Sequence, residues 1–184
     1  YPGFIDSHCH FLNLGLSLQQ IDLKGTQSFE EVITLLQGAS REKQMEVILG
    51  RGWDQNDWEV KAFPKKERLD ELFPDIPVAL RRIDGHALLV NQKALDLAGI
   101  TVDTEIEGGT IIKENGKLTG VLVDAPMQLV YDVLPEPSVE QKVKALQDAE
   151  EISFANGLTT VSVAGMDKED IFLVDSLQQK GLLT

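Results

Sequence analysis

The sequence predicts a mixed α/β fold with two outer α/β pieces and an α/β segment inserted between them. Three observations support this prediction. The chain opens on a strand at residues 3–10, a β-branched strand at 158–163 lies between two helices, and the residues in the middle contain strands, helices and a hairpin. Hydrophobic residues make up 42% of the 184 residues. This proportion is enough for a packed core, so we expect an ordered chain.

The opening strand places polar side chains on one face. Ile5 is a good strand former, and side chains alternate between the two faces of a strand. Asp6, His8 and His10 are therefore expected to share one face, whereas Cys9 points to the other. This pattern brings two imidazoles side by side.

Capping residues and hydrophobic periodicity predict the other elements in chain order. Helices are expected where Ser, Asn, Asp or Pro precedes apolar residues at helical spacing, and strands where short apolar runs lie between turn residues. The expected helices are 28–40, 64–73, 91–98, 138–156 and 167–181. The expected later strands are 47–49, 77–83, 110–112, 118–123 and 158–163. Asn115-Gly116 predicts a tight hairpin turn between two of these strands.

Charge and cysteine content limit the classes of partner. The formal net charge of −13 would repel phosphate backbones, so no nucleic-acid partner is expected, and no basic cluster suggests a membrane surface. Cys9 is the single cysteine, which fits a reducing, cytoplasmic location or simply a fold that needs no disulfide. No apolar run approaches the roughly 20 residues of a transmembrane helix, and no signal peptide is visible. Because the first residues already have the character of a buried strand, we expect an excised piece of a longer protein.

His8 and His10 are the first candidates for metal ligands. Two imidazole nitrogens at one strand end suit a Zn²⁺-like ion. Taken alone, His-x-His is a weak signal that favours histidines hydrogen-bonded in a core or exposed at a sheet edge over metal ligands. Asp6 could orient one of the histidine rings by a hydrogen bond to it, or it could cap a nearby backbone amide. Cys9 is expected in the core and not as a ligand.

Two loops carry the other candidates, which we assign to substrate binding. Asp84 and His86 follow a predicted strand, where they could contact substrate or transfer protons. They could also form a turn in which Asp84 binds backbone amides. Trp53 follows another strand, where it could form the wall of a substrate pocket or close the core.

The run from Pro2 to His10 resembles the first barrel strand of the amidohydrolase superfamily, whose members are (β/α)₈ barrels with metal at the C-terminal mouth. Later motifs follow the order seen in amidohydrolase family 3, the group of YtcJ-like proteins and N-substituted formamide deformylase. These motifs include Gly52-Trp53-Asp54, Asp84-Gly85-His86-Ala87, Leu118-Thr119-Gly120-Val121-Leu122 and Gly157-Leu158-Thr159-Thr160-Val161.

The resemblance implies a metal-dependent hydrolase that cleaves a C–N bond in a small amide-type substrate. In such sites the metal lowers the pKa of a bound water to about 7 and polarises the scissile carbonyl. His8 and His10 match the first two ligands of the family. The remaining ligands and the proton-shuttling aspartate come from later barrel strands, whose motifs do not occur here. We therefore expect this chain to bind zinc weakly or not at all, and to be inactive by itself.

The resemblance also implies a partial barrel with an insertion. Residues 1–10 would form the first barrel strand, 11–136 a mixed α/β subdomain over the barrel mouth, and 137–184 a helix, the second barrel strand and its following helix. Open strand edges and apolar surface predict self-association. The alternative is a non-catalytic binding or assembly module of the same ancestry with a vestigial His-x-His.

Overall fold

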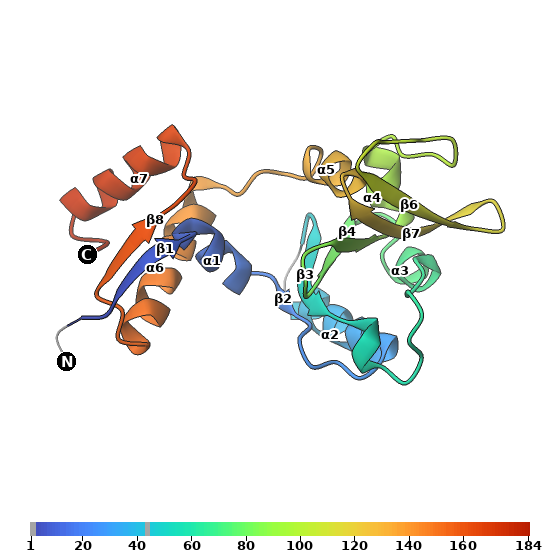
Figure 1. Cartoon of the computed structure of the whole chain (residues 1–184), viewed down its shortest axis with the longest axis horizontal. Helices are drawn as coiled ribbons and strands as arrows, with labels where there is room; N and C mark the ends of the chain where they lie inside the picture. Colours follow the sequence, from blue (N-terminus) through green and yellow to red (C-terminus); the bar gives the residue numbers. More distant parts are fainter. Residues whose placement is uncertain (1–2, 43–44) are drawn as a thin grey trace. The chain divides into compact units, whose positions relative to one another are not determined.

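The computed structural model describes residues 3–42 and 45–184, so Pro2 of the opening motif lies outside the described residues. The chain forms two compact units (Figure 1). The outer unit contains residues 3–19 and 136–184, and the inserted unit spans residues 20–135. Residues 11–19, which we expected in the inserted subdomain, therefore belong to the outer unit.

The outer unit is built on a pair of parallel strands, β1 (Ile5–Cys9) and β8 (Thr160–Val163). Three helices accompany this pair: α1 (Phe11–Leu18), α6 (Val139–Ala155) and α7 (Lys168–Gln179). Their apolar faces form one core together with residues of both strands. This core places the end of β1 directly before a packed helix.

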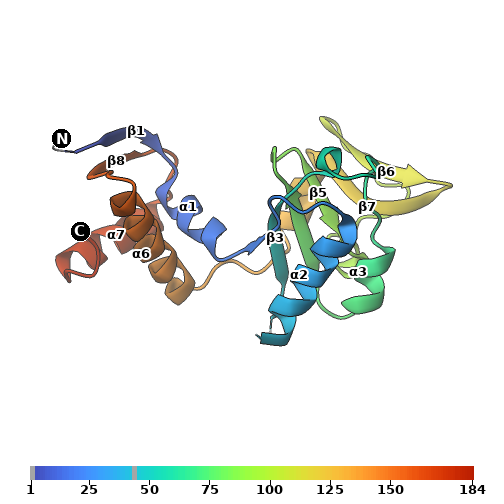
Figure 2. The same cartoon turned by 90° about the horizontal axis from the view of Figure 1, so that it is seen from below.

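Helix α1 explains why the unit boundary differs from the expected one. It packs side by side with α6 (Figures 1 and 2), so closely that a Cβ atom added to Gly15 would lie 1.8 Å from the carbonyl oxygen of Ala145. Phe11 and Leu12 are buried in the same core. The helix was not predicted because its N-cap, His10, makes no side-chain capping bond. Tertiary packing, not local propensity, forms this helix.

The inserted unit contains a mixed six-stranded sheet in the order β2-β3-β4-β5-β7-β6. The first three strands of that order are parallel, and the other neighbours are antiparallel. The strands are β2 (Ile21–Asp22), β3 (Ile48–Trp53), β4 (Val78–Arg82), β5 (Ala87–Val90), β6 (Gly109–Glu114) and β7 (Lys117–Asp124).

Helices cover both faces of this sheet (Figure 1). One core contains Leu80 and Leu89 with helices α2 and α3, and the other contains Ala79 and Leu88 with helices α4 and α5. Neighbouring residues on each strand thus enter opposite cores, as the alternation of side chains requires. The helices are α2 (Phe29–Glu42), the short 3₁₀ helix η1 (Gln55–Asp57), α3 (Glu67–Leu72), α4 (Gln92–Leu97) and α5 (Pro126–Tyr131).

Most predicted caps and turns are confirmed. The Asn91 side chain accepts from the Ala94 amide at the start of α4, and Ser138 forms a complete capping box at the start of α6. Asn115 and its following glycine both have positive φ angles, as a tight hairpin turn requires. Asp167 occupies the expected N-cap position of α7, but its side chain makes no capping hydrogen bond.

Four short elements, β2, β5, α5 and the 3₁₀ helix η1, escaped prediction, and one helix begins later than expected. Strand β5 is buried on both faces, so it shows no alternation, and α5 starts at Pro126. Helix α3 begins at Glu67 and not near Pro64. Within the part of the chain that the structure describes, no helix has the length and apolar character needed to cross a bilayer.

The same substitution at two helical glycines should have opposite effects. Gly15→Ala should destabilise the outer unit by about 1–3 kcal/mol, because its methyl group meets the backbone of α6. Gly38→Ala should stabilise the inserted unit by about 0.5–1 kcal/mol, because no atom lies within 4 Å of the added Cβ and alanine favours helix. Urea unfolding followed by circular dichroism measures both effects. Equal changes in the free energy of unfolding for the two variants would contradict the close contact between Gly15 and the backbone of α6.

Candidate functional site

His8 and His10 lie at the end of β1 with their rings beside each other. The ring centroids are 5.2 Å apart, the ring planes are at 83°, and both residues are exposed. The pairing of β1 with β8 is irregular here, since Asp6 pairs with Val161 but Cys9 pairs with Val163. One extra residue on β1 breaks the simple alternation that we assumed. The two imidazoles are nevertheless adjacent.

The histidine pair fits a tetrahedral metal ion as two of its ligands. With metal–nitrogen distances of about 2.0–2.1 Å and tetrahedral angles, two bound imidazoles have centroids about 5 Å apart. The observed separation of 5.2 Å agrees with this value. In residues 3–42 and 45–184, no group of three or more His, Cys, Asp or Glu side chains could hold a metal ion. The described residues by themselves therefore contain no complete metal site.

Asp6 does not orient a histidine ring in this structure. Its Oδ1 atom accepts a hydrogen bond of 3.0 Å from the backbone N–H of His8. This is the amide-capping role that we set beside the ring-orienting role. This hydrogen bond restrains the backbone at His8.

Cys9 lies half-buried against the core of the outer unit, as expected. Burial raises the pKa of its thiol, and the nearby charge of Asp6 raises this pKa further. Both effects favour the neutral thiol over the thiolate that binds metal. Cys9 is therefore a poor ligand and a poor nucleophile.

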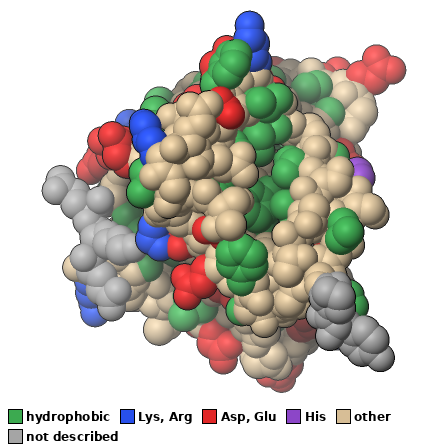
Figure 3. All heavy atoms as spheres, turned by 90° about the vertical axis from the view of Figure 1, so that its left-hand side faces the viewer, with side chains coloured by type: hydrophobic (Ala, Val, Ile, Leu, Met, Phe, Trp, Pro, Cys, Tyr) green, Lys and Arg blue, Asp and Glu red, His purple; other side chains and the backbone are tan. Residues whose placement is uncertain are grey.

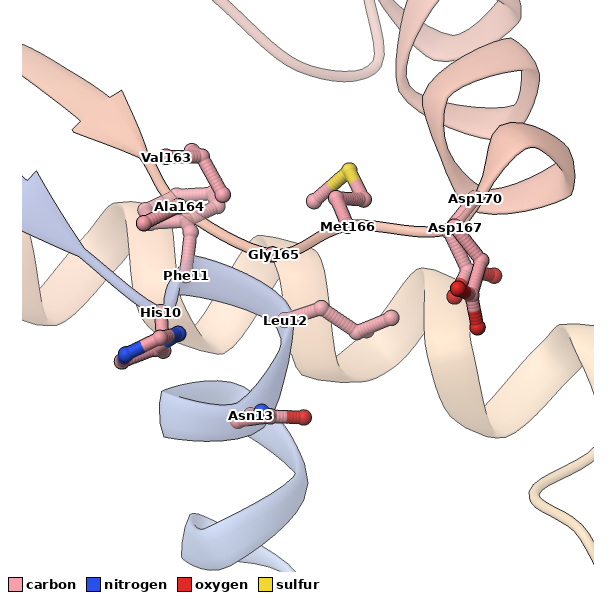
Figure 4. Close-up of a pocket in the computed structure, with 10 residues that line it drawn as sticks. All are labelled: His10, Phe11, Leu12, Asn13, Val163, Ala164, Gly165, Met166, Asp167 and Asp170. Carbon is pink, nitrogen blue, oxygen red and sulfur yellow. The ribbon is translucent and has the colours of Figure 1, made fainter.

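A hollow of about 190 Å³ lies where β1 and β8 end (Figure 4). His10 lies at one end of it, and the carboxylates of Asp167 and Asp170 lie together at the other end. Asp170 is largely buried and accepts a hydrogen bond of 2.7 Å from Lys142 Nζ, which raises the pKa of Lys142. Ligand sites in α/β folds favour the carboxyl ends of parallel strands, so His10 stands in such a position.

A second polar group occupies one end of the six-stranded sheet, where β4 and β7 finish and β5 begins. We call Arg82, Asp84, His86 and Asp124 the strand-end cluster. Arg82 Nε and Nη2 donate to the two carboxylate oxygens of Asp84 at 2.9 and 2.7 Å, and Asp84 also accepts from the His86 amide at 3.0 Å. The Arg82 hydrogen bonds hold the pKa of Asp84 below its usual value.

The two loop residues proposed for substrate binding have different environments. Both oxygens of Asp84 are engaged by Arg82, so the structure favours the turn-forming role that we left open for it. The side chain of His86 is 71% exposed, and its Nδ1 atom lies 2.7 Å from Oδ1 of Asp124. His86 therefore stays a candidate for substrate contact. Asp124 was missed because it lies 38 residues away in the sequence.

Trp53 belongs to the core of the inserted unit and not to a pocket wall. It is 1% exposed, and its indole N–H donates to the carbonyl of Leu80 at 2.8 Å. It also packs against Trp58, with ring centroids 6.0 Å apart. A fully enclosed indole has no face left for substrate, so the core-closing alternative is the correct one for this chain.

Comparison with known proteins identifies the family. The sequence profile of the amidohydrolase family matches residues 1–181. This chain belongs to the amidohydrolase family. It is 39% identical over 165 residues to YtcJ of Bacillus subtilis, whose name assigns it to the amidohydrolases, covering 86% of this chain and 31% of YtcJ. The predicted family resemblance is thereby confirmed.

Other relatives of this amidohydrolase-family chain carry different names. Protein LONG AFTER FAR-RED 3 of Arabidopsis thaliana is 39% identical over 163 residues, covering 87% of this chain and 28% of that protein. N-substituted formamide deformylase of Arthrobacter pascens is 28% identical over 172 residues, covering 89% and 32%. An uncharacterised metal-dependent hydrolase of Pyrococcus horikoshii superposes with a TM-score of 0.73 at 29% identity, covering 99% and 35%. The chain thus spans about a third of the length of the proteins it matches.

The Arg82–Asp84 pair should give this amidohydrolase-family chain a specific acid sensitivity. A lowered pKa contributes stability that is present above the unfolded-state value, 3.8, and is lost as pH falls through the folded-state value. Asp84→Asn should therefore reduce stability at neutral pH, by at most about 1 kcal/mol because the pair is partly exposed. Its difference from the wild type should shrink below about pH 3.8.

Urea midpoints measured from pH 7 to pH 3 test this expectation. Asp75→Asn is the matched control, since Asp75 is exposed and its side chain makes no hydrogen bond or ion pair to the described residues. A difference between Asp84→Asn and the wild type that stays constant across the pH range would refute the assigned role.

Proposed function

We propose that this chain is the N-terminal part of a metal-dependent hydrolase that cleaves a C–N bond in a small amide-type substrate. The observation that carries the proposal is the His8–His10 pair, with ring centroids 5.2 Å apart at the end of a parallel strand. Membership of the amidohydrolase family supports a hydrolase. The name of the N-substituted formamide deformylase supports a C–N bond as the target.

The parallel pairing of β1 with β8 supports a further part of the proposal, that these are the first two strands of a (β/α)₈ barrel. His8 and His10 would hold a divalent metal, which we propose to be zinc. When bound, the metal would supply a water of lowered pKa and would polarise the scissile carbonyl. In this scheme the inserted unit shapes substrate access, and the isolated chain is inactive because the other ligands lie elsewhere.

The alternative is a binding or assembly module of amidohydrolase ancestry whose His-x-His is vestigial. This alternative is supported by the described residues, among which no three or more His, Cys, Asp or Glu side chains are grouped so as to hold a metal ion. A lysine or glutamate, two further histidines and a late aspartate in the same reading frame would favour the hydrolase. A reading frame without them would favour the module.

Zinc titration by calorimetry tests the ligand role directly. We expect weak binding, with a Kd above about 1 µM, because two neutral imidazoles hold the ion without further protein ligands. His8→Ala and His10→Ala should each abolish the binding. His86→Ala should leave it unchanged, and serves as the control because His86 belongs to the other unit.

Two outcomes of this titration would count against the proposal as stated. Sub-micromolar binding that His8→Ala abolishes would refute weak binding, since it would require ligands that we have not identified. No detectable heat, with wild-type behaviour in both variants, would favour a vestigial pair.

The outer unit is also proposed to self-associate. Hydrophobic side chains gather on its surface (Figure 3), and Phe4 and Ile5 are 63% and 71% exposed. Among the described residues, β1 and β8 each have one unpaired edge. Exposed apolar surface and open edges favour strand pairing between copies.

Light scattering coupled to gel filtration measures this association. The mass should rise with protein concentration, and Ile5→Lys should lower it by placing a charge on the edge strand. Val60→Lys is the control, because Val60 is equally exposed at 71% but lies in the inserted unit. A monodisperse wild-type monomer at all concentrations would rule the association out.

A further inference from the structure

His86 is held at three points by two carboxylate residues of the strand-end cluster. Its backbone N–H donates to Asp84 Oδ1 at 3.0 Å, and its carbonyl accepts from the Asp124 N–H at 3.1 Å. Its ring Nδ1 lies 2.7 Å from Asp124 Oδ1. Backbone and ring are therefore both restrained, although the side chain is 71% exposed.

The second ring nitrogen of His86 is free. Nε2 makes no hydrogen bond to any residue that the structure describes, while Nδ1 is committed to Asp124. In a neutral imidazole one nitrogen carries the proton and the other accepts, and the partner of one nitrogen decides which. A carboxylate can only accept, so it selects the form with the proton on Nδ1.

The other groups of the cluster do not compete for Asp124. Arg82 is occupied by Asp84 through two hydrogen bonds, and its guanidinium also lies 5.6 Å from the ring centroid of Phe63. Arg81 donates to the carbonyl of Gly85. Asp124 therefore has His86 as its side-chain partner among the described residues.

We propose that Asp124 is a positioning residue that keeps the proton of neutral His86 on Nδ1, so that Nε2 meets substrate as a hydrogen-bond acceptor. The substrate group that fits is an N–H or O–H donor, and the N–H of an amide is one such group. This role rests on the proposed function, because it assumes that an amide-type substrate reaches the inserted unit.

The backbone at Asp124 makes a clean test available. Its φ angle is +59°, a left-handed conformation that glycine adopts freely and that aspartate and asparagine tolerate. Asp124→Gly therefore removes the carboxylate without backbone strain. The hairpin residue Asn115 has a φ angle of +51°, so Asn115→Gly makes the same kind of backbone change away from the cluster.

Nitrogen NMR of protein labelled with ¹⁵N-histidine reads the tautomer. The chain has three histidines, and loss of one signal set in His86→Gln assigns His86. In alkaline buffer, wild type and Asn115→Gly should show His86 protonated on Nδ1. Asp124→Gly should shift the tautomer ratio toward Nε2–H by about tenfold, the effect of losing one hydrogen bond to a charged group. Asp124→Asn should shift it less, since its amide oxygen can still accept.

Reaction with diethyl pyrocarbonate tests whether Nε2 is available to an incoming group. Peptide mass mapping should show that His86 is carbethoxylated in the wild type, and several-fold more slowly in Asp124→Gly at equal fold content by circular dichroism. Wild-type protein with the proton on Nε2, or variants with unchanged tautomer and reactivity, would overturn the proposal. Failure here leaves zinc binding at His8 and His10 unaffected, so the two proposals fail separately.

Discussion

Backbone hydrogen bonds between β1 and β8 are the constraint on which the rest of the structure depends. Phe4 donates to Gly157 at 2.7 Å, Thr159 donates to Phe4 at 2.9 Å, and Ala164 donates to Cys9 at 2.8 Å. These hydrogen bonds join the two sequence segments of the outer unit, which are separated in the sequence by the inserted unit. The entropy cost of closing such a loop grows slowly with its length, so a large insertion is compatible with this pairing when the insertion folds on its own core.

In both units, chemistry-bearing side chains follow the ends of strands. His10 comes directly after β1, and the loop after β8 carries Asp167. In the inserted unit, Asp84 follows β4, and Asp124 is the last residue of β7. In the six-stranded sheet the strand interiors face a core on each side, so its polar groups gather where the strands stop. The sites therefore depend on strand register as much as on residue identity.

Local signals predicted much of this architecture. The Ser138 capping box, the Asn91 cap and the Asn115 turn each act within a few residues, so their sequence patterns determine the outcome. Helix α1 was missed because it is stabilised by packing against α6, which is distant in the sequence, and strand β5 was missed because burial on both faces leaves it without alternation. Pattern alone cannot report such packing.

The candidate site shows the same division between local and long-range information. The adjacency of His8 and His10 follows from their spacing and survives the irregular pairing of β1. The role of Trp53 depends on the position of Leu80, and the role of His86 depends on Asp124. Both partners are supplied by sheet topology. A sequence motif could therefore identify the candidate residues, whereas the role of each one could be assigned only from its contacts in the folded structure.

The fold of the outer unit positions His8 and His10, and that fold is stabilised by its apolar core and not by the two histidines. The core below it consists of apolar contacts among α1, α6 and α7, with Phe11 and Leu146 buried. In small zinc domains, metal binding supplies the folding free energy. Here the core follows immediately after His10, and the capped amide of His8 restrains the backbone at the other histidine. The protein's own contacts thus hold the two rings near each other. Under the proposed function, this arrangement would lower the entropy cost of binding the ion, and further ligands from another segment would complete the site.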